Sequence, residues 1–430
     1  MILRTSRSVP WDIFEEHLDE ASFLWGQWER ALVAANYALN DVAAGPEARL
    51  LAHLDGLVLG GGPVAHELLL PALRADESER SAAAAWGLVQ AEHQVDHQDD
   101  VIDAMVYGQR TGRRAIARAL ELSPQADLDR ISKRWPGGSP ETRASLIDIV
   151  AWRDSDRARP WLEPAFRSGE AVLLAAALRG ARRSPDPAFL GWIEDALSSD
   201  EHEVRAEAIA AGVCLRSPAA WEACRAAASG TTTAERLPLG VLATSAASRD
   251  RLMVRECVAD ASARRDAIWA LGFAGDVEAA DTLVEATADE TVSRIAAEAF
   301  SAITGLVLGS TFVEPGASRG PDVEEVREDD PPPIVRPEDH LLAPKANAVA
   351  TWWRRARSGH RPGVRLILGR PRTDESVRAA LGTTTMWRRE VLWLDLARTT
   401  SPPPRVHLKA WTADQLRQLQ ADAAAKALPR

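Results

Sequence analysis

The sequence predicts an all-α protein: a right-handed α-solenoid of helix pairs followed by a small, mostly helical C-terminal module. Three observations support this prediction. Alanine and leucine dominate the apolar residues, which make up 46% of the chain, and both lose little side-chain freedom in a helix. A helix–turn–helix phrase at residues 270–305 has weaker copies upstream, about 30 residues apart. A proline-rich acidic stretch then separates these repeats from a basic tail.

Residues 1–60 are predicted to form an N-terminal helical cap. The segments 11–18 and 21–39 have the apolar spacing of two amphipathic helices. Their aromatic side chains are Trp11, Phe14, Phe23, Trp25 and Trp28. The terminal repeat of a solenoid has an outer face that no further repeat covers, so an atypical composition suits a cap.

Residues 61–313 are predicted to form the repeat region. Its last helix places six apolar residues on one face, at Val292, Ile295, Ala296, Ala299, Phe300 and Ile303. Weaker copies of this pattern span 190–215, 161–180 and 69–86. Four glycines are expected to end helices of successive repeats, namely Gly180, Gly212, Gly272 and Gly305.

Residues 314–339 are predicted to be an extended linker. They contain nine acidic residues, three arginines and six prolines; proline removes backbone donors and like charges resist collapse. Beyond the linker, residues 345–430 hold 17 Lys and Arg against 6 Asp and Glu, a balance of +11. Residues 1–344 hold 34 basic and 56 acidic residues, a balance of −22. This asymmetry predicts two parts with different electrostatic roles.

The C-terminal module, residues 340–430, is predicted to be mostly helical. Its expected elements are helices at 346–357 and 387–397, a strand or extended connection at 364–368, and a last helix to about residue 428. Thr373 is placed to cap a helix. Thr412 with Gln415 matches a capping box for the last helix.

Two features predict a cytoplasmic protein without membrane contact. No apolar stretch approaches the roughly 20 residues that span a bilayer, and the arginines at 4 and 7 precede no apolar signal region. The three cysteines, Cys214, Cys224 and Cys257, show no CxxC spacing. They are expected to be small, buried apolar residues of a protein that lies in a reducing compartment.

The repeat phrase resembles HEAT-like repeats of the kind found in the phycobilin-lyase group. The residues that match, in the strongest unit at 266–305, are Ala270, Leu271, Gly272, Gly275, Asp276, Ala280, Leu283, Asp289, Val292, Arg294 and Ala297. The whole chain is also similar to an uncharacterised bacterial family of HEAT-repeat proteins, through residues 17–21, Trp25, 53–57, 60–61, 352–353 and 368–371. This resemblance implies no established activity, although some such families are associated with bacterial secretion systems.

Histidines beside acidic residues offer candidate metal sites. HEAT-repeat iron hydroxylases use four His-Glu pairs, but this chain has only two, at 66–67 and 202–203, several repeats apart. The start of a helix, where a carboxylate suits the macrodipole, is the preferred explanation of each pair. His93 and His97 lie one helical turn apart and could share a metal with Asp100. A solvated acidic helix face explains the same residues without metal. We expect no metal or cofactor, and a metal-dependent enzyme using this cluster is the alternative.

No other motif predicts chemistry. Residues 60–63 are glycine-rich, but they lack the lysine of a phosphate loop and follow no strand, so they predict a turn between helices. The GxSxG pattern of a nucleophile elbow is absent from the sequence. The chain is therefore not expected to be an enzyme.

The tail places tryptophans beside arginines, as in Trp352, Trp353, Arg354 and Arg355. Arginine pairs with phosphates and tryptophan stacks on bases, so nucleic-acid binding through the C-terminal module is one alternative. Docking on the acidic repeats or on an acidic partner is a second, and a tryptophan core with a basic surface is a third. Because the acidic repeats would repel phosphates, nucleic acid is not the expected partner.

Together these patterns predict a non-enzymatic scaffold or adaptor that binds a protein partner in the bacterial cytoplasm. Such surfaces draw their affinity from a few aromatic and arginine anchors. The repeat residues predicted as anchors are Trp152, Arg205, Trp269 and Arg294, joined by the four tail residues named above. Trp152 and Trp269 suit a core between repeats equally well. The pattern predicts no particular oligomeric state.

Overall fold

The computed structural model describes residues 9–75, 77–90, 96–230, 235–315 and 336–427. The chain forms two compact units. Unit 1 comprises the described parts of Met1–Leu32, Asn40–Trp192 and Lys409–Gln415, and unit 2 those of Val33–Leu39, Ile193–Leu408 and Leu416–Arg430. The chain therefore passes between the units at 32/33, 39/40, 192/193, 408/409 and 415/416.

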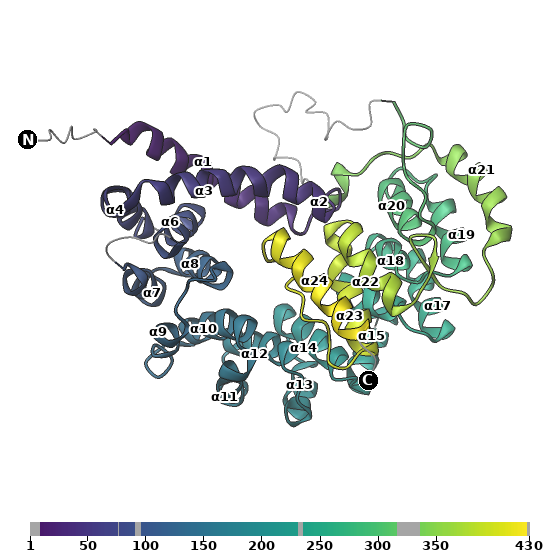
Figure 1. Ribbon diagram of the computed structural model, residues 1–430. Coiled ribbons are helices and arrows are strands. Elements are labelled where there is room, and N and C mark those ends of the chain that lie inside the picture. The colour runs from purple at the N-terminus through teal and green to yellow at the C-terminus, as the bar shows by residue number, and fades with distance from the viewer. Residues whose placement is uncertain (1–8, 76, 91–95, 231–234, 316–335, 428–430) are drawn as a thin grey trace, which may run out of the picture. The chain divides into compact units, whose positions relative to one another are not determined.

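The regular secondary structure among the described residues of unit 1 is helical. The helices are α1 (Trp11–Ala31), α3 (Ala48–Leu59), α4 (Gly61–Val64), α5 (Leu70–Leu73), α6 (Ser78–Gln90), α7 (Gln98–Tyr107), α8 (Arg110–Leu122), α9 (Leu128–Ser132), α10 (Pro140–Arg153), α11 (Ser155–Phe166) and α12 (Ala171–Arg183) (Figure 1). Helices α2 (Leu39–Val42) and α13 (Leu190–Ala196) cross a boundary between the units. Short turns are π-helical at Ala43–Glu47 and Ala65–Leu69 and 3₁₀ at Pro187–Phe189.

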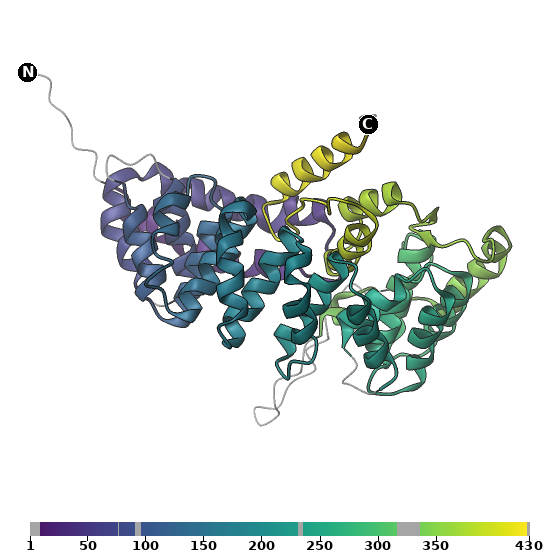
Figure 2. The same cartoon turned by 90° about the horizontal axis from the view of Figure 1, so that it is seen from below.

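Helices of unit 1 pack in a series that follows the chain, mainly with every second helix in contact. Helix α1 packs on α3 and α6, and then α6 packs on α8, α8 on α10 and α10 on α12 (Figure 2). Helix α11 packs on both α10 and α12. The alanines at 82–85 of α6 are fully buried, and such small side chains let helices approach closely.

The regular secondary structure among the described residues of unit 2 is helical apart from one hairpin and two isolated β-bridges, Ala38–Thr385 and Val313–Pro344. Its helices are α14 (His202–Cys214), α15 (Pro218–Ala228), α16 (Arg236–Ala243), α17 (Ser248–Glu256), α18 (Arg264–Leu271), α19 (Val277–Ala286), α20 (Ser293–Thr304), α21 (Ala346–Ala356), α22 (Asp374–Thr383) and α23 (Arg389–Thr399). In the antiparallel hairpin of β1 (Leu366–Ile367) and β2 (Arg370–Pro371), Leu366 pairs with Pro371. The 3₁₀ turns lie at Cys257–Ala259, Pro337–His340, Arg357–Gly359 and Met386–Arg388, and α24 (Thr412–Ala427) crosses the boundary at 415/416.

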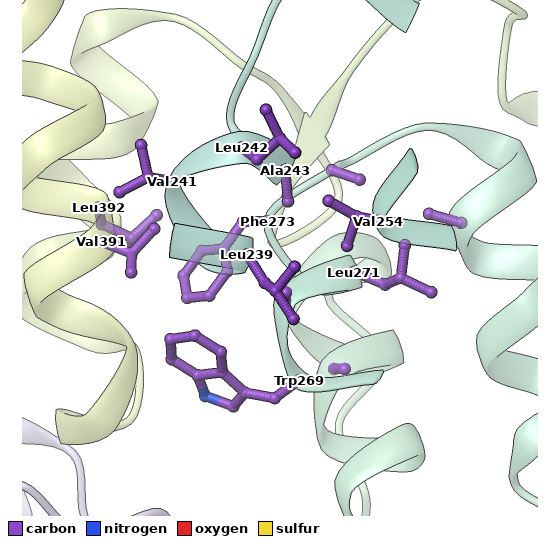
Figure 3. Packing of buried hydrophobic residues seen from close by; sticks show 14 of the residues in the cluster. Leu239, Val241, Leu242, Ala243, Val254, Trp269, Leu271, Phe273, Val391 and Leu392 are labelled. Carbon is purple, nitrogen blue, oxygen red and sulfur yellow. The ribbon is translucent and has the colours of Figure 1, made fainter. Parts of the chain in front are cut away.

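One hydrophobic core holds unit 2 together. Figure 3 shows side chains of α16, α17 and α18 packed with side chains of α23, and Trp269 and Val391 belong to this same buried cluster. Val349 and Trp353 of α21 belong to it as well. The tail therefore shares its core with the helices at 193–306, and burial of this apolar surface stabilises both.

The apolar stripe predicted for the last repeat is confirmed. All six positions are buried, five on α20 and Val292 as the residue that precedes it. Gly305 follows the last residue of α20 in the left-handed conformation. Gly272 likewise follows the last residue of α18. The predicted helix ends at Gly180 and Gly212 are wrong, because both glycines lie inside helices, α12 and α14. A Cβ atom on either would lie within 2.7 Å of a neighbouring side chain, so both glycines permit close packing.

The two opening helices predicted at 11–18 and 21–39 are one helix, α1, since no breaker lies between Leu18 and Ala21. This helix ends at Ala31, so the predicted continuation to residue 39 is wrong. Trp25 and Trp28 are buried on it, whereas Trp11 and Phe23 are exposed. In the tail, the predicted cap at Thr373 is confirmed, because its side chain accepts a hydrogen bond from the Ser376 backbone N–H. Helices α21 and α23 lie where the tail helices were predicted.

The predicted segments 1–60, 61–313, 314–339 and 340–430 follow composition, whereas the two units follow contacts, so the two divisions fall at different residues. Residues 316–335 of the predicted linker lie outside the described residues. Among the described residues, no single helix has both the length and the apolar composition needed to cross a membrane. One bent pair, Leu39–Leu59 with Gly61–Leu73, meets those limits by length and composition alone.

Candidate protein-binding site

Trp152, a predicted anchor, lies on α10 of unit 1 and is partly buried. The guanidinium of Arg183, from α12, lies 3.6 Å from the centre of its ring. An arginine over an indole face is a favourable cation–π contact. One face of Trp152 is therefore used to join α10 and α12.

The predicted arginine anchors of the repeats make contacts within unit 2. Arg205 of α14 pairs with Glu235 and donates to the carbonyl oxygen of Ser199 at 2.7 Å. Arg294 of α20 donates to the carbonyl oxygen of Leu341. Both side chains therefore join a helix to a neighbouring segment of the same unit.

Trp269 lies in the core of unit 2, where 3% of its surface is exposed. Its ring is 4.8 Å from Phe273 and 6.2 Å from Trp387, both edge-to-face. The guanidinium of Arg236 lies 5.2 Å from the ring of Trp269 and equally far from that of Trp387. This tryptophan joins α18 to the tail.

Trp352 and Trp353 pack the tail against α19 and α20. Trp353 is buried, and its indole N–H donates to Oδ1 of Asp281 at 2.7 Å. Arg357 donates to both oxygens of Asp281, at 2.9 and 2.7 Å, and lowers the pKa of that carboxyl below its usual value. The partly buried ring of Trp352 lies edge-to-face against Phe300, at 5.9 Å.

Arg354 and Arg355 differ from the other predicted anchors because both side chains are exposed near the end of α21. Arg354 donates to the hydroxyl of Thr351 at 2.9 Å. Together they place two cationic groups at the surface of unit 2. Of the eight predicted anchors, these two offer a charged surface directly.

Glu298, which the sequence analysis did not single out, is the buried acceptor for the tail. Nε of Arg388 donates to Oε1 of Glu298 at 2.6 Å, and a second nitrogen of the same guanidinium donates to Oε2. The hydroxyl of Thr385 and the indole N–H of Trp387 donate to Glu298 at 3.0 and 3.1 Å. Arg388 is 1% exposed. Burying this charge needs the carboxylate opposite it.

Residues 365–369, which comprise Arg365, strand β1 and the two-residue turn of the hairpin, lie across the ends of α18 and α20 and are called the clasp segment below. The backbone N–H of Leu366 donates to the carbonyl oxygen of Gly275 at 2.8 Å. The backbone N–H groups of Leu368 and Gly369 donate to the carbonyl oxygens of Ala302 and Ile303, also at 2.8 Å. These carbonyls lie at or beyond the ends of helices, where oxygens have no partner within the helix.

Two glycines make this approach possible. Gly275 and Gly305 have φ of +74° and +73°, which residues with a Cβ atom rarely adopt. A Cβ atom on Gly275 would lie 2.5 Å from the carbonyl oxygen of Leu366, and one on Gly305 would lie 2.7 Å from that of Leu368. Two glycines of the predicted repeat phrase thus also admit the clasp segment.

Arg365 begins the clasp segment and binds three backbone carbonyls. It donates to Thr244 at 2.7 Å, Phe273 at 3.0 Å and Ala274 at 2.8 Å. These residues follow α16 and α18, whose C-terminal ends favour a cation. Burial lowers the pKa of Arg365 to about 10, so its guanidinium stays charged at neutral pH.

A second buried carboxylate, Glu47, lies at the end of the π-helical turn Ala43–Glu47 in unit 1. It accepts a hydrogen bond from the indole N–H of Trp28 at 2.8 Å. The Thr412 backbone N–H lies 2.9 and 3.0 Å from its two oxygens, and the Thr412 hydroxyl lies 2.5 Å from one. Burial raises the pKa of Glu47 above its usual value.

Trp411 is enclosed by three other tryptophans of unit 1. Its ring stacks on Trp28 at 4.4 Å, with Trp86 at 5.0 Å and Trp25 at 6.1 Å in edge-to-face contact. Only 6% of its surface is exposed. The capping box predicted from Thr412 and Gln415 is wrong, because the hydroxyl donates to Glu47 and the amide of Gln415 donates to the carbonyl oxygen of Ala410.

The predicted metal cluster falls partly outside the described residues, because His93 lies there. Nδ1 of His97 is 3.2 Å from Oδ2 of Asp100. Two arginines at and after α9 form ion pairs with the acidic residues. Arg130 lies 2.7 Å from Asp96, and Arg134 lies 2.6 Å from Asp103. A hydrogen bond from the Gln98 backbone lowers the pKa of Asp96. Among the described residues, no group of three or more His, Cys, Asp or Glu could hold a metal ion.

The two His-Glu pairs belong to different units. His66 contacts its own neighbour Glu67 at 3.3 Å, and His202 contacts Glu235 at 3.3 Å. The cysteines are buried, as predicted, and burial raises the pKa of Cys224 to about 12. At that pKa the Cys224 thiol is not ionised at neutral pH.

Comparison with known proteins finds no family model that matches this chain and no curated protein that is similar to it.

The residues that the sequence analysis missed are those whose partners are distant in the chain. Glu298 interrupts the alanines of the buried face of α20, a signal that an acidic side chain is held inside. Glu47 carries no such signal, because its donors Trp28 and Thr412 come from opposite ends of the chain.

Proposed function

We propose that this chain is a non-enzymatic HEAT-repeat scaffold or adaptor that binds a protein partner in the bacterial cytoplasm. The architecture that we propose is a right-handed α-solenoid of helix pairs. Two runs of packing support it. In unit 1, alternate helices α6, α8, α10 and α12 pack in series, and in unit 2, α16 packs on α18 and α18 on α20. Stacking between neighbouring pairs is how a solenoid buries its apolar faces.

The observation that carries the functional proposal is the clasp segment. Helix ends of unit 2 bind strand β1 and the hairpin turn that follows it through three backbone hydrogen bonds and the guanidinium of Arg365. The same surface uses buried aromatic and arginine side chains, such as Trp353 and Arg388, to hold the tail. Backbone pairing with a few deep anchors is also how proteins recognise partner segments.

The exposed arginines of α21 are the proposed contact for an acidic partner. Arg354 and Arg355 project from a helix whose buried face is fixed by Val349 and Trp353. A rigid support lowers the entropic cost of using an exposed side chain for binding. Their charge favours association with acidic surfaces.

The test is affinity capture from native cytosol, followed by reconstitution of the complex from purified proteins. The variant carries Arg354→Glu and Arg355→Glu, because deleting residues 340–430 would remove part of the unit 2 core. We expect a stoichiometric partner whose affinity falls at least tenfold with this variant, as charge reversal at a contact implies. The matched control reverses Arg110 and Arg114, an exposed pair on α8, and should bind normally.

Two results would contradict the proposal. The first is that no purified protein binds the intact chain above the level of an unrelated acidic protein. The second is one equivalent of bound metal on elemental analysis, lost with His93→Ala, which would favour the metal-dependent enzyme. Steep salt-dependent binding of an oligonucleotide, lost with the Arg354→Glu/Arg355→Glu variant, would favour the nucleic-acid alternative instead.

A further inference from the structure

Trp25, Trp28, Trp86 and Glu47 form what is called the Trp411 site below. The site contacts two features of the segment that occupies it. Three indole rings enclose the side chain of Trp411, and the Glu47 carboxylate accepts the backbone N–H and hydroxyl of Thr412. Because Thr412 is the first residue of α24, the carboxylate lies at the positive end of a helix, where an anion is favoured.

The occupant is remote from the rest of unit 1 along the chain. Unit 1 otherwise ends at Trp192, and residues on both sides of Lys409–Gln415 belong to unit 2. Glu47 and Thr412 are separated by 365 positions. No local chain connection therefore defines the site, and the same contacts are available to a segment of another protein.

The resident segment fits this site incompletely. The indole Nε1 of Trp411 is buried, yet it has no hydrogen-bond partner among the described residues. A buried N–H without a partner weakens the contact that buries it. The donors to Glu47 are the uncharged groups of Trp28 and Thr412, so the buried carboxylate is held without the cation that most buried acids have.

The backbone around Glu47 is also unusual. Glu47 is the last residue of a π-helical turn, Ala43–Glu47, that contains Pro46. Single π-helical turns inside helices occur frequently at functional sites. Here the turn precedes α3 and directs the carboxylate toward Trp28 and Thr412.

We propose that the Trp411 site is a peptide-recognition site for a partner protein, which inserts the start of a helix that begins with tryptophan followed by threonine or serine. In the isolated chain, Lys409–Gln415 occupies the site in place of the partner. This inference rests on the proposed adaptor function and assigns it a surface and a ligand. The partner helix displaces the resident segment and forms the same contacts with Glu47.

The test uses a synthetic peptide of residues 409–427 as the probe and the full-length chain as the receptor. The variant Trp411→Ala/Thr412→Pro vacates the site, since proline at the first helical position keeps α24 and removes both donors to Glu47. We expect the peptide to bind this variant at least tenfold more tightly than it binds the wild-type chain, measured by fluorescence anisotropy. A control peptide with Trp411→Ala and Thr412→Ala should not bind.

A second measurement keeps the proposal testable if the vacated variant does not fold. Excess peptide added to the wild-type chain should displace the resident segment and speed hydrogen exchange at the Thr412 amide. Unchanged exchange there, or no peptide binding to a folded vacated variant, overturns the proposal. Concentration-dependent dimers of the wild-type chain that the peptide dissociates would assign the site to a second copy and overturn a partner protein.

The outcomes also separate this site from the adaptor function itself. Peptide binding together with a failed partner reconstitution would overturn the adaptor function and keep the site. A reconstituted partner that binds the wild-type and vacated chains equally, with no peptide binding, would overturn the site alone.

Discussion

Two buried carboxylates accept hydrogen bonds from the C-terminal part of the chain, one from a charged donor and the other from uncharged donors. In unit 2, Glu298 faces the guanidinium of Arg388 and also accepts from Thr385 and Trp387. In unit 1, Glu47 accepts only uncharged donors, from Trp28 and Thr412. Both carboxylates belong to residues less than a tenth exposed. The difference lies in the charge of the donors.

This difference separates a permanent contact from one suited to exchange. Removing one member of a buried ion pair leaves the other charge buried without a partner, which is strongly unfavourable. A buried acid held by neutral donors already has an unfavourable charged form, as the raised pKa of Glu47 reflects. Replacing Glu47 by a neutral acceptor therefore costs far less than replacing Glu298.

The largest expected effect is that of Glu298→Gln. It leaves Arg388 buried without an anion, and we expect unit 2 to lose about 3–5 kcal/mol of unfolding free energy. Hydrogen exchange of the α20 amides in increasing urea measures this loss locally. The matched variant Glu47→Gln should cost unit 1 no more than about 1 kcal/mol. The glutamine oxygen at the Oε2 position still accepts from Trp28 and the Thr412 backbone N–H, and the glutamine amide can donate to the Thr412 hydroxyl. Equal losses would show that the charge of the donors does not matter.

The next effect concerns the close backbone approach in unit 2. Gly275→Ala should destabilise unit 2 by about 2 kcal/mol or more, since alanine resists the left-handed conformation and its Cβ would meet the Leu366 carbonyl oxygen at 2.5 Å. Gly382 provides the control, because it lies within α22 with no atom within 4 Å of an added Cβ. Gly382→Ala should stabilise by about 0.5–1 kcal/mol. The same loss at both positions would refute the packing explanation.

A smaller effect distinguishes the two stacked tryptophans of unit 1. Trp28→Phe removes the donor to Glu47, whereas Trp411→Phe removes an indole N–H that has no partner among the described residues. Both changes remove the same ring atoms. We expect Trp28→Phe to cost about 1–2 kcal/mol more than Trp411→Phe in the unfolding of unit 1. Thermal unfolding of both variants measures the difference, and a larger loss with Trp411→Phe would contradict the assignment of donors.

The smallest effect is a dependence on pH. The pKa of Glu47 is raised in the folded chain above its usual value of 4.5, so between these two values the folded chain binds more protons than the unfolded chain. Stability from this group is complete below about pH 4.5 and is lost as the pH rises through the folded pKa. The stability of wild type relative to Glu47→Gln should therefore fall with rising pH. Chemical unfolding of both chains between pH 4.5 and about 8 tests the sign.

Local patterns predicted local structure well. The stripe from Val292 to Ile303 predicted α20 because every apolar residue of that stripe faces the core. Thr373 predicted its own helix start for the same reason, since the donor that it binds, Ser376, is three residues away. Both signals depend on spacing within one helix, which the sequence displays directly.

Long-range partners escaped prediction for the opposite reason. Thr412 and Gln415 have the spacing of a capping box, but a buried carboxylate 365 positions away competes for the hydroxyl. Arg388 was grouped with a basic tail, yet Glu298 draws it inside unit 2. Nothing in the local sequence distinguishes a solvated arginine from one that is neutralised by a distant acid.

The order in which the chain is synthesised gives the arrangement of unit 1 a consequence in time. The part of unit 1 up to Trp192, which includes the residues that surround Trp411, leaves the ribosome long before Lys409–Gln415, because residues 193–408 are made in between. At about 5–20 residues per second, these 216 residues take roughly 10–40 s to translate. For that interval every nascent chain presents the Glu47 carboxylate without its own threonine, and a partner helix present at the ribosome meets no competitor.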